Sequence, residues 1–227
     1  MGRLVRNIVA VLVLGYFVAR VCNVFAAANF VGNSSTTAAT QPSSMQHIVK
    51  TSDGTLHAFV QMGTQTSLCG GVSKSGLLWF DSTDGGTTWV CQGQLSSDTT
   101  NLMYASAVVD SSDNIYVVYS VTANGSSANY QVYYDRLTKG TGSTWTLGAQ
   151  QTVLSSTSTT AYSYATVTVQ GSTRLWLAVR YLNNPNYQVQ TYYSDGLTDA
   201  PTWTQSSANL ETPGSNGSWH IPTIVRF

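Results

Sequence analysis

A Thr-Trp pair recurs three times in this chain, ending at Trp89, Trp145 and Trp203. The tryptophans are separated by 56 and 58 residues, and this regular spacing restricts the fold more strongly than any other property of the sequence. Repeats of this kind form similar structural units that pack against their neighbours, because one unit alone cannot bury its apolar face.

Each repeat carries the pattern of four short strands. An opening strand is predicted at 46–50, 106–110, 165–169 and 221–225. A second strand is predicted at 54–60, 113–119 and 173–179, a third at 76–82, 129–135 and 186–194, and a fourth after each tryptophan. Apolar and polar residues alternate in these segments, with Gly, Asn, Asp and Ser between them, which favours strands over helices.

Four strands per repeat predict an all-β protein, specifically a β-propeller of four-stranded antiparallel blades. Three complete blades would span about 45–103, 104–161 and 162–218, and 219–227 would supply the first strand of a fourth. Propellers typically close with about four to eight blades. Two explanations therefore remain open: the chain is the front part of a longer propeller, or copies associate through the open ends.

The N-terminus has the pattern of a targeting segment. A basic start is followed by a twelve-residue apolar run at 8–19 and by small residues near position 28. Residues 1–28 are therefore predicted to be a secretory signal, with a short membrane anchor as the alternative and no stable membrane span expected. A Ser/Thr-rich linker follows at 29–44.

Export to an oxidising compartment bears on the cysteines. Cys69 and Cys91 are the only two that remain after the signal, and they form either one disulfide or two small buried apolar contacts.

Charge excludes some partners. The chain has 10 basic and 10 acidic residues and only 9% charged residues, so no basic patch is available for nucleic acid. The three histidines lie at no metal-ligand spacing, and no cofactor is expected.

The segment "STDGGTTW", residues 82–89, reads as a tight hairpin turn. The Ser82 and Asp84 side chains can bind turn amides, Gly86 permits a positive φ, and Trp89 can anchor the next strand. This segment fits the pattern S-x-D-x-G-x-x-W and resembles the Asp-box (BNR) repeats of the sialidase superfamily. The resemblance covers about residues 44–227. The second turn, 135–145, keeps an acid, glycines and Thr-Trp, and the third keeps Ser194, Asp195, Gly196 and Trp203.

The resemblance implies that these turns lie on the face opposite the active site. The acids expected to be structural for this reason are Asp53, Asp81, Asp84, Asp113, Asp135, Asp195 and Asp199. The functional face would then be built from the loops at about 62–75, 120–129 and 181–187, and from the links at 95–104, 150–163 and 205–219.

Few candidate site residues fall on that face. Asp98 and Glu211 are the catalytic candidates, and Arg180, Trp219, His220 and Tyr104 are the substrate-binding candidates. Further aromatic residues within reach are Tyr162, Tyr164, Tyr181 and Tyr187. Such rings stack on sugars, but packing between blades is the alternative use.

Sialidases use a tyrosine nucleophile, and the resemblance also implies an arginine cluster that holds the substrate carboxylate. Only four arginines remain after the signal, and too few of them are well placed to form a complete sialidase site. The sequence therefore predicts a secreted sialidase-like propeller module that recognises glycans or a surface and lacks a complete catalytic site. The alternatives are the N-terminal fragment of an exo-sialidase or other glycoside hydrolase, and a structural or adhesive repeat protein. The expected partner is a carbohydrate or glycoprotein.

Overall fold

The computed structural model describes residues 45–65, 69–99, 101–122, 131–142, 144–157, 160–183, 186–206 and 222–224. The chain separates into two compact units, Met1–Phe30 and Val31–Phe227, and all described residues belong to the second. The expected signal at 1–28 and linker at 29–44 lie outside the described residues. In the described part, no helix is long and apolar enough to cross a membrane.

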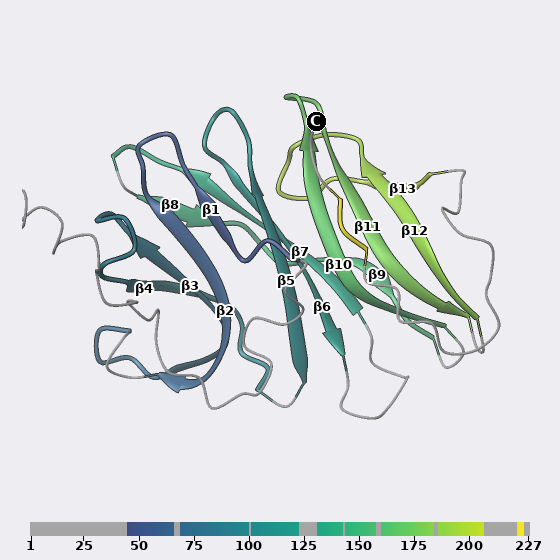
Figure 1. Ribbon diagram of the computed structural model, residues 1–227, viewed down its shortest axis with the longest axis horizontal. Coiled ribbons are helices and arrows are strands. Elements are labelled where there is room, and N and C mark those ends of the chain that lie inside the picture. The colour runs from purple at the N-terminus through teal and green to yellow at the C-terminus, as the bar shows by residue number, and fades with distance from the viewer. Residues whose placement is uncertain are drawn as a thin grey trace, which may run out of the picture. The chain divides into compact units, whose positions relative to one another are not determined.

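The prediction of an all-β chain is confirmed, since the described residues form strands and no helix (Figure 1). The first sheet contains β1 (Ile48–Lys50), β2 (Leu56–Gln65), β3 (Lys74–Ser82) and β4 (Val90–Ser96). The second contains β5 (Leu102–Val109), β6 (Ile115–Thr122), β7 (Gln131–Lys139), β8 (Trp145–Leu147) and β9 (Gln151–Ser155). The third contains β10 (Thr160–Gln170), β11 (Arg174–Asn183), β12 (Asn186–Ser194) and β13 (Trp203–Gln205). Strands that follow one another within a sheet pair antiparallel, apart from β8 and β9, which both pair with β7.

The last strand of the second sheet differs from the prediction of one fourth strand per repeat. It is divided into β8 and β9, which both pair with β7. At the division, the Gly148 amide donates to the Arg136 carbonyl at 2.8 Å. The chain thus leaves β7 briefly and returns to it, which no feature of the repeat pattern indicates.

Apolar layers separate the three sheets. One buried cluster joins the first and second sheets and includes Phe59, Trp79, Val117 and Tyr119. A second buried cluster joins the second and third sheets. Strand β6 contributes to both clusters, because Val117 and Tyr119 belong to the first and Tyr116 and Val118 to the second. Because β6 is buried on both faces, its sequence "IYVVYSVT" is almost continuously apolar or aromatic.

Two predicted boundaries are wrong. The hairpins β2–β3 and β11–β12 extend further than expected, so much of 62–75 and 181–187 is strand rather than loop. The opening strand predicted at 221–225 is not formed by its described part, since residues 222–224 have no strand pairing. Residues 221 and 225 lie outside the described residues.

The short turns of all three sheets gather at one end of the strands, which we call the turn end. It comprises the segments 51–55, 83–89, 110–114, 140–144, 171–173 and 195–202. Bonds between neighbouring sheets join several of these turns. The Ser52 amide and hydroxyl donate to the Asp113 carboxylate at 2.7 and 2.5 Å.

Lys139 Nζ lies 2.6 Å from Asp113 and 3.0 Å from Asp53, and both carboxylates raise the pKa of this lysine. Burial alone would raise the pKa of Asp113, but hydrogen bonds from Lys139 and Ser52 outweigh it and leave the pKa below its ordinary value. Arg136 binds Asp199 of the third sheet in the same way, at 3.0 Å. Asp53, Asp113 and Asp199 are therefore bound in contacts at the turn end.

The 82–89 turn is closed by its own side chains. Ser82 Oγ donates to Asp84 and accepts from the Gly86 amide, both at 2.8 Å. Asp84 also accepts from the Thr88 amide and hydroxyl at 2.8 and 2.7 Å, and these bonds lower the pKa of Asp84 to about 2. Gly86 has a φ of 92°, and its carbonyl accepts from Trp89 Nε1 at 3.1 Å. Every residue of the pattern thus has a local structural partner.

The other two turns repeat this arrangement only in part. In the third turn, Ser194 Oγ donates to the Gly196 carbonyl at 2.7 Å, and Asp195 accepts from the Thr202 amide at 2.9 Å. Trp203 begins β13 and packs against the cluster between the second and third sheets. In the second turn, Gly140 and Thr144 bond to each other through their backbones.

Asp81 and Asp135, which fall in the predicted strands 76–82 and 129–135, lie inside β3 and β7, within the interface of the first and second sheets. Asp81 accepts from His57 Nδ1 at 2.6 Å and from Trp79 Nε1 at 2.5 Å. Asp135 is only 1% exposed, and its Oδ2 has no hydrogen-bond partner among the described residues. Burial raises the pKa of Asp135 to about 7, partly offset by a hydrogen bond from Tyr119. The turn pattern alone does not reveal either burial.

Cys69 and Cys91 form a disulfide, with their Cα atoms 4.8 Å apart. The bond ties the connection between β2 and β3 to the start of β4, and both cysteines pack against an apolar cluster of the first sheet. Of the two alternatives for these residues, the structure has the covalent one.

Candidate functional site

Three tyrosines and one arginine from the second and third sheets form a continuous stack, which we call the tyrosine–arginine stack. Tyr104 of β5 stacks on Tyr164 of β10, with ring centroids 4.8 Å apart and an angle of 23° between the planes. The Arg180 guanidinium of β11 lies 4.4 Å from the Tyr164 ring centroid and 5.0 Å from that of Tyr187 in β12. The stack lies toward the end of the strands opposite the turn end.

A β-bulge places Tyr164 in this stack. The β10–β11 register shifts between Ser163 and Thr166, and Tyr164 has a φ of 54°, which is unusual for a bulky residue. The Tyr164 amide donates across to the Ser120 hydroxyl of β6 at 2.9 Å. Bulges of this kind redirect a side chain, and strained backbone persists only where the surroundings enforce it. The fold therefore maintains an unfavourable conformation that brings Tyr164 between Tyr104 and Arg180.

Arg180 is fixed more firmly than the sequence indicates. It lies within β11 rather than at its end and is only 9% exposed. Its Nε donates to the Ser163 hydroxyl at 2.9 Å, and tyrosine rings lie against the guanidinium plane. A guanidinium held in this way has a fixed planar geometry.

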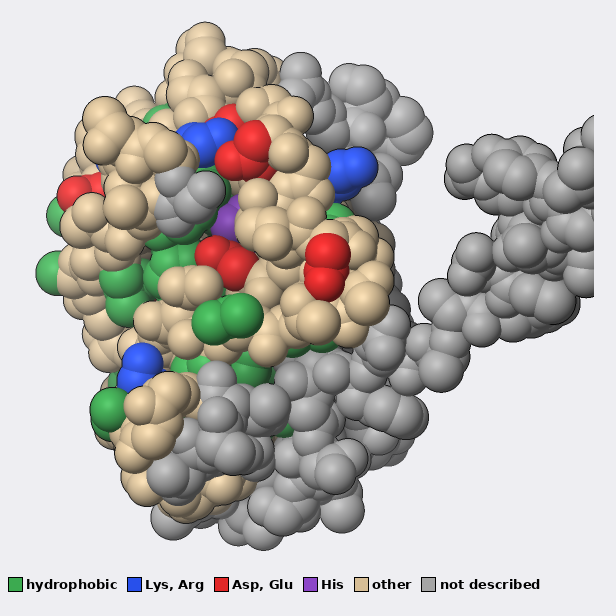
Figure 2. Space-filling view, turned by 90° about the vertical axis from the view of Figure 1, so that its left-hand side faces the viewer, with side chains coloured by type: hydrophobic (Ala, Val, Ile, Leu, Met, Phe, Trp, Pro, Cys, Tyr) green, Lys and Arg blue, Asp and Glu red, His purple; other side chains and the backbone are tan. Residues whose placement is uncertain are grey.

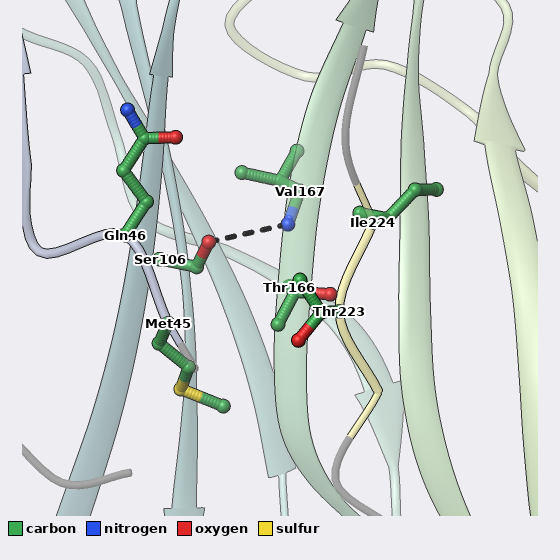
Figure 3. Close-up of a pocket in the computed structure, with 7 residues that line it drawn as sticks. All are labelled: Met45, Gln46, Ser106, Thr166, Val167, Thr223 and Ile224. Atoms are coloured by element: carbon green, nitrogen blue, oxygen red, sulfur yellow. Dashed lines mark hydrogen bonds between the residues drawn. The ribbon is translucent and has the colours of Figure 1, made fainter. Parts of the chain in front are cut away.

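A pocket of about 210 Å³ adjoins the stack. Figure 3 shows Met45, Gln46 and Ser106 on one side of it, and Thr166, Val167, Thr223 and Ile224 on the other. Met45 also belongs to the buried cluster that contains Tyr104 and Tyr164, so the pocket and the stack share a wall. We call this the first-strand pocket, because it lies along β5 and β10 beside the residues that precede β1.

The remaining sequence candidates do not join this arrangement in the described part of the chain. Asp98 follows β4, and its carboxylate accepts from the Asn101 amide and side chain at 3.2 and 2.6 Å. Burial and, secondarily, the Asp98 charge raise the pKa of Tyr133 in β7. Glu211, Trp219 and His220 lie outside the described residues.

The structure thus brings together Tyr104 and Arg180 from the candidate set, through Tyr164. Tyr162 and Tyr181 form a separate pair with centroids 5.1 Å apart. Sequence reasoning missed Ser163, Ser106 and Thr166, because serine and threonine are too frequent in this chain to stand out. The one usable signal is the segment "YSYA" at 162–165, where tyrosines two residues apart predict one shared face, which the bulge alters.

Figure 2 shows the face of the molecule on the side of the first sheet, where charged side chains are few among uncharged polar ones. Among the described residues no group of three or more His, Cys, Asp or Glu side chains could hold a metal ion. Stacked rings, one guanidinium and neutral hydroxyls can bind a ligand by stacking and hydrogen bonding.

Comparison with known proteins gives a limited result. The sequence matches no protein-family description and no curated protein. The fold is similar to that of a polysaccharide lyase described as an ulvan lyase, with a TM-score of 0.49 and 15% identity over 70% of this chain and 42% of that one. It is also similar to an endo-arabinase from Bacteroides thetaiotaomicron, with a TM-score of 0.45 and 12% identity over 73% of this chain and 61% of that one.

A protein of unknown function from Dyadobacter fermentans has a TM-score of 0.43 and 18% identity, over 70% of this chain and 49% of that one. This chain therefore spans less than two thirds of the length of each of these proteins.

Proposed function

We propose that this protein is a secreted, sialidase-like Asp-box propeller module that recognises carbohydrate at the tyrosine–arginine stack and the adjoining pocket. The observation that carries the proposal is the position of Tyr164, which the fold strains into a stack with Tyr104 and Arg180. Strained backbone of this kind clusters at ligand sites, and a β-bulge redirects a side chain, which supports a role of the Tyr164 ring in binding.

Sugar recognition fits the chemistry of these groups. Aromatic rings offer flat apolar faces to the C–H groups of a sugar ring, and the Arg180 guanidinium packs against the Tyr164 and Tyr187 rings and orders them. Tyr164 and Tyr187 are both partly exposed, so each ring has some surface within reach of a ligand.

The blade arrangement is part of the same proposal. Three antiparallel sheets follow one another in sequence and pack face to face through apolar layers, with their short turns at one end. Blades of a propeller are related in this way, and the hydrogen bonds of the 82–89 turn give each residue of the Asp-box pattern a structural role. The Cys69–Cys91 disulfide is consistent with export, because such bonds persist in oxidising compartments.

Binding rather than turnover is favoured by the acids. Ordinary glycosidases need two carboxyl groups flanking the scissile bond, and a sialidase-type site with a tyrosine nucleophile needs an arginine cluster, whereas the stack contains the single arginine Arg180. The carboxylate of Asp98, the only catalytic candidate among the described residues, is engaged by Asn101, and the tyrosine–arginine stack contains no carboxylate. The propeller would therefore hold a glycan without cleaving it.

Two tyrosines of β12 provide a matched test. Tyr187 and Tyr193 lie on the same strand, and each has an arginine carbon 5.0 Å from its ring centroid, Arg180 and Arg174 respectively. Only Tyr187 belongs to the stack. After a glycan array has identified a ligand, we expect Tyr187→Ala to weaken its binding by about tenfold or more, and Tyr193→Ala to leave affinity unchanged.

The binding constants are measured by isothermal titration calorimetry, with circular dichroism to verify that both variants are folded. Equal effects of the two substitutions, or the absence of any bound glycan at millimolar concentration, would contradict the proposal. Release of free sugar by the wild-type protein would contradict the non-catalytic part of it.

A further inference from the structure

The first sheet is apolar on both of its faces. On the face toward the second sheet, Phe59, Leu77 and Trp79 belong to the cluster that the two sheets share. The alternate residues of β2 and β3 form a separate buried cluster on the other face. We call this set the outer cluster, and it comprises Ala58, Val60, Met62, Leu78 and Phe80. A sheet at the end of a stacked array is expected to carry polar residues on its outer face, so an apolar one needs a cover.

The connection between β2 and β3 provides this cover. Its residues 69–73 are described, and Cys69 among them is 6% exposed and packs in the same cluster as Val60 and Phe80. The disulfide partner Cys91 lies opposite Phe80 in the register of β3 and β4, so Cys91 is on the outer face as well. The disulfide therefore lies over the outer face and holds the connection against it.

The disulfide is the firmest link between this connection and the sheet. The Val72 amide donates to the Cys69 carbonyl at 3.2 Å, a bond that shapes the connection without reaching the sheet. Gly70 and Gly71 have φ values of 64° and 84°, and the space beside their Cα atoms is open. Val72 is 59% exposed. Because a loop with so few packed residues gains conformational entropy on release, the outer cluster depends on the covalent bond for its cover.

An uncovered outer cluster matches a second copy of itself. The sheets of this chain already associate through apolar faces of the same kind. The formal net charge of the chain is zero, so two copies have little charge repulsion to overcome. Ile48 of β1 lies opposite Ala58 in the register and is 46% exposed, which extends the apolar surface beside the cluster. Two identical faces that meet about a two-fold axis form a closed dimer.

We infer that the outer cluster is a contact surface for a second copy of this chain, and that the Cys69–Cys91 disulfide keeps this surface covered. With the disulfide formed, the protein is a monomer. Without it, two copies associate through their first sheets. The inference does not depend on the proposed carbohydrate recognition, because the tyrosine–arginine stack lies in the second and third sheets.

The double variant Cys69→Ser/Cys91→Ser tests the inference. Light scattering over a range of concentrations should give the monomer mass for the wild type and about twice that mass for the variant. Circular dichroism verifies that the variant keeps its strands. Wild-type protein that is reduced after folding is the second measurement and avoids a folding defect. A water-soluble phosphine supplies two electrons to the S–S bond, both sulfurs take up protons to become thiols, and the phosphine becomes its oxide with oxygen from water.

Ile48 and Val90 provide a matched pair that identifies the face. Both are exposed strand residues, at 46% and 55%, but Val90 lies opposite Asp81 and therefore on the other face of the sheet from Cys91. In the disulfide-free variant, Ile48→Lys should restore the monomer mass, and Val90→Lys should leave the dimer intact. A monomeric disulfide-free protein, or aggregates of mixed size, would overturn the inference. Equal effects of the two lysine substitutions would overturn it as well, because the contact would not be on the outer face.

Discussion

The turn end and the site at the opposite end of the strands are built from different interactions. At the turn end, Lys139 and Ser52 join neighbouring sheets through charges and hydrogen bonds. At the other end, Tyr164 and Arg180 are joined by stacked rings, and the adjoining pocket is neutral. The turn end stabilises the contact between sheets, and under the proposed function the other end would serve ligand binding.

Among the substitutions considered, removal of the Asp81 carboxylate should lower the free energy of unfolding most. Asp81→Ala leaves His57 and Trp79 without their shared buried acceptor near the turn end. Loss of one partner from such a buried pair typically lowers the free energy of unfolding by about 3–5 kcal/mol. Urea denaturation measures this loss, and glycan affinity of the folded variant should stay at the wild-type value.

Asp81→Asn is the control, because its amide oxygen can still accept from Trp79 and should lose less stability. If Asp81→Ala left stability unchanged, or weakened glycan binding in the folded protein, the separation between the two ends would not hold.

Asp135 should make stability depend on pH. Its carboxyl has a pKa of about 7 in the folded protein and an ordinary value of 3.8. Between these values the folded state keeps a proton that the unfolded state has lost. The free energy of unfolding should therefore fall by on the order of 2–4 kcal/mol as pH rises from about 4 to about 7, and this contribution stays constant above that.

Asp135→Asn removes this titration, so the variant should be more stable than wild type at pH 8 and nearly equal to it at pH 4. Denaturation curves at both pH values provide the measurement. If the free energy of unfolding depended on pH identically in both proteins, the Asp135 carboxyl would not be the cause of that dependence. Because Asp135 lies between the sheets rather than at the ligand site, glycan affinity should not follow this profile.

The smallest effect is expected for Lys139→Met. The substitution removes the cation between Asp53 and Asp113, so the pKa of each acid should rise toward its ordinary value. Surface ion pairs contribute little and are screened by salt, so the loss in Tm should be small and should shrink at 1 M NaCl. A large loss in Tm that salt does not change would indicate instead that the contact of Lys139 Nζ with the Trp145 ring, 5.8 Å from its centroid, is the main contribution.

Much of the fold follows from sequence, because alternation of apolar residues directly reflects burial of one strand face. The hairpins of all three repeats formed where "GTLHAFV", "DNIYVVY" and "TRLWLAV" predicted a second strand. The division of the last strand into β8 and β9 was not predictable, since it depends on the backbone bond between Gly148 and Arg136.

The candidate site was predictable only in its residue types. Arg180 and Tyr104 stand out as a rare cation and an aromatic beside a predicted strand. Their association depends on the bulge at Tyr164, which reverses the face of the strand between Ser163 and Thr166. The pocket depends on Ser106 and Thr166, which share a site only because β5 lies beside β10.

The sequence by itself determined the repeat, the strand content and the turn chemistry at 82–89, since each of these depends on residues close together in the chain. Only the tertiary structure decided which polar groups are buried. Asp81 has two partners, whereas Asp135 Oδ2 has no hydrogen-bond partner in the part of the chain that the structure describes. The tertiary structure also decided which side chains meet across sheets. Burial and inter-sheet contact are properties of packing between distant segments, and local sequence does not encode them.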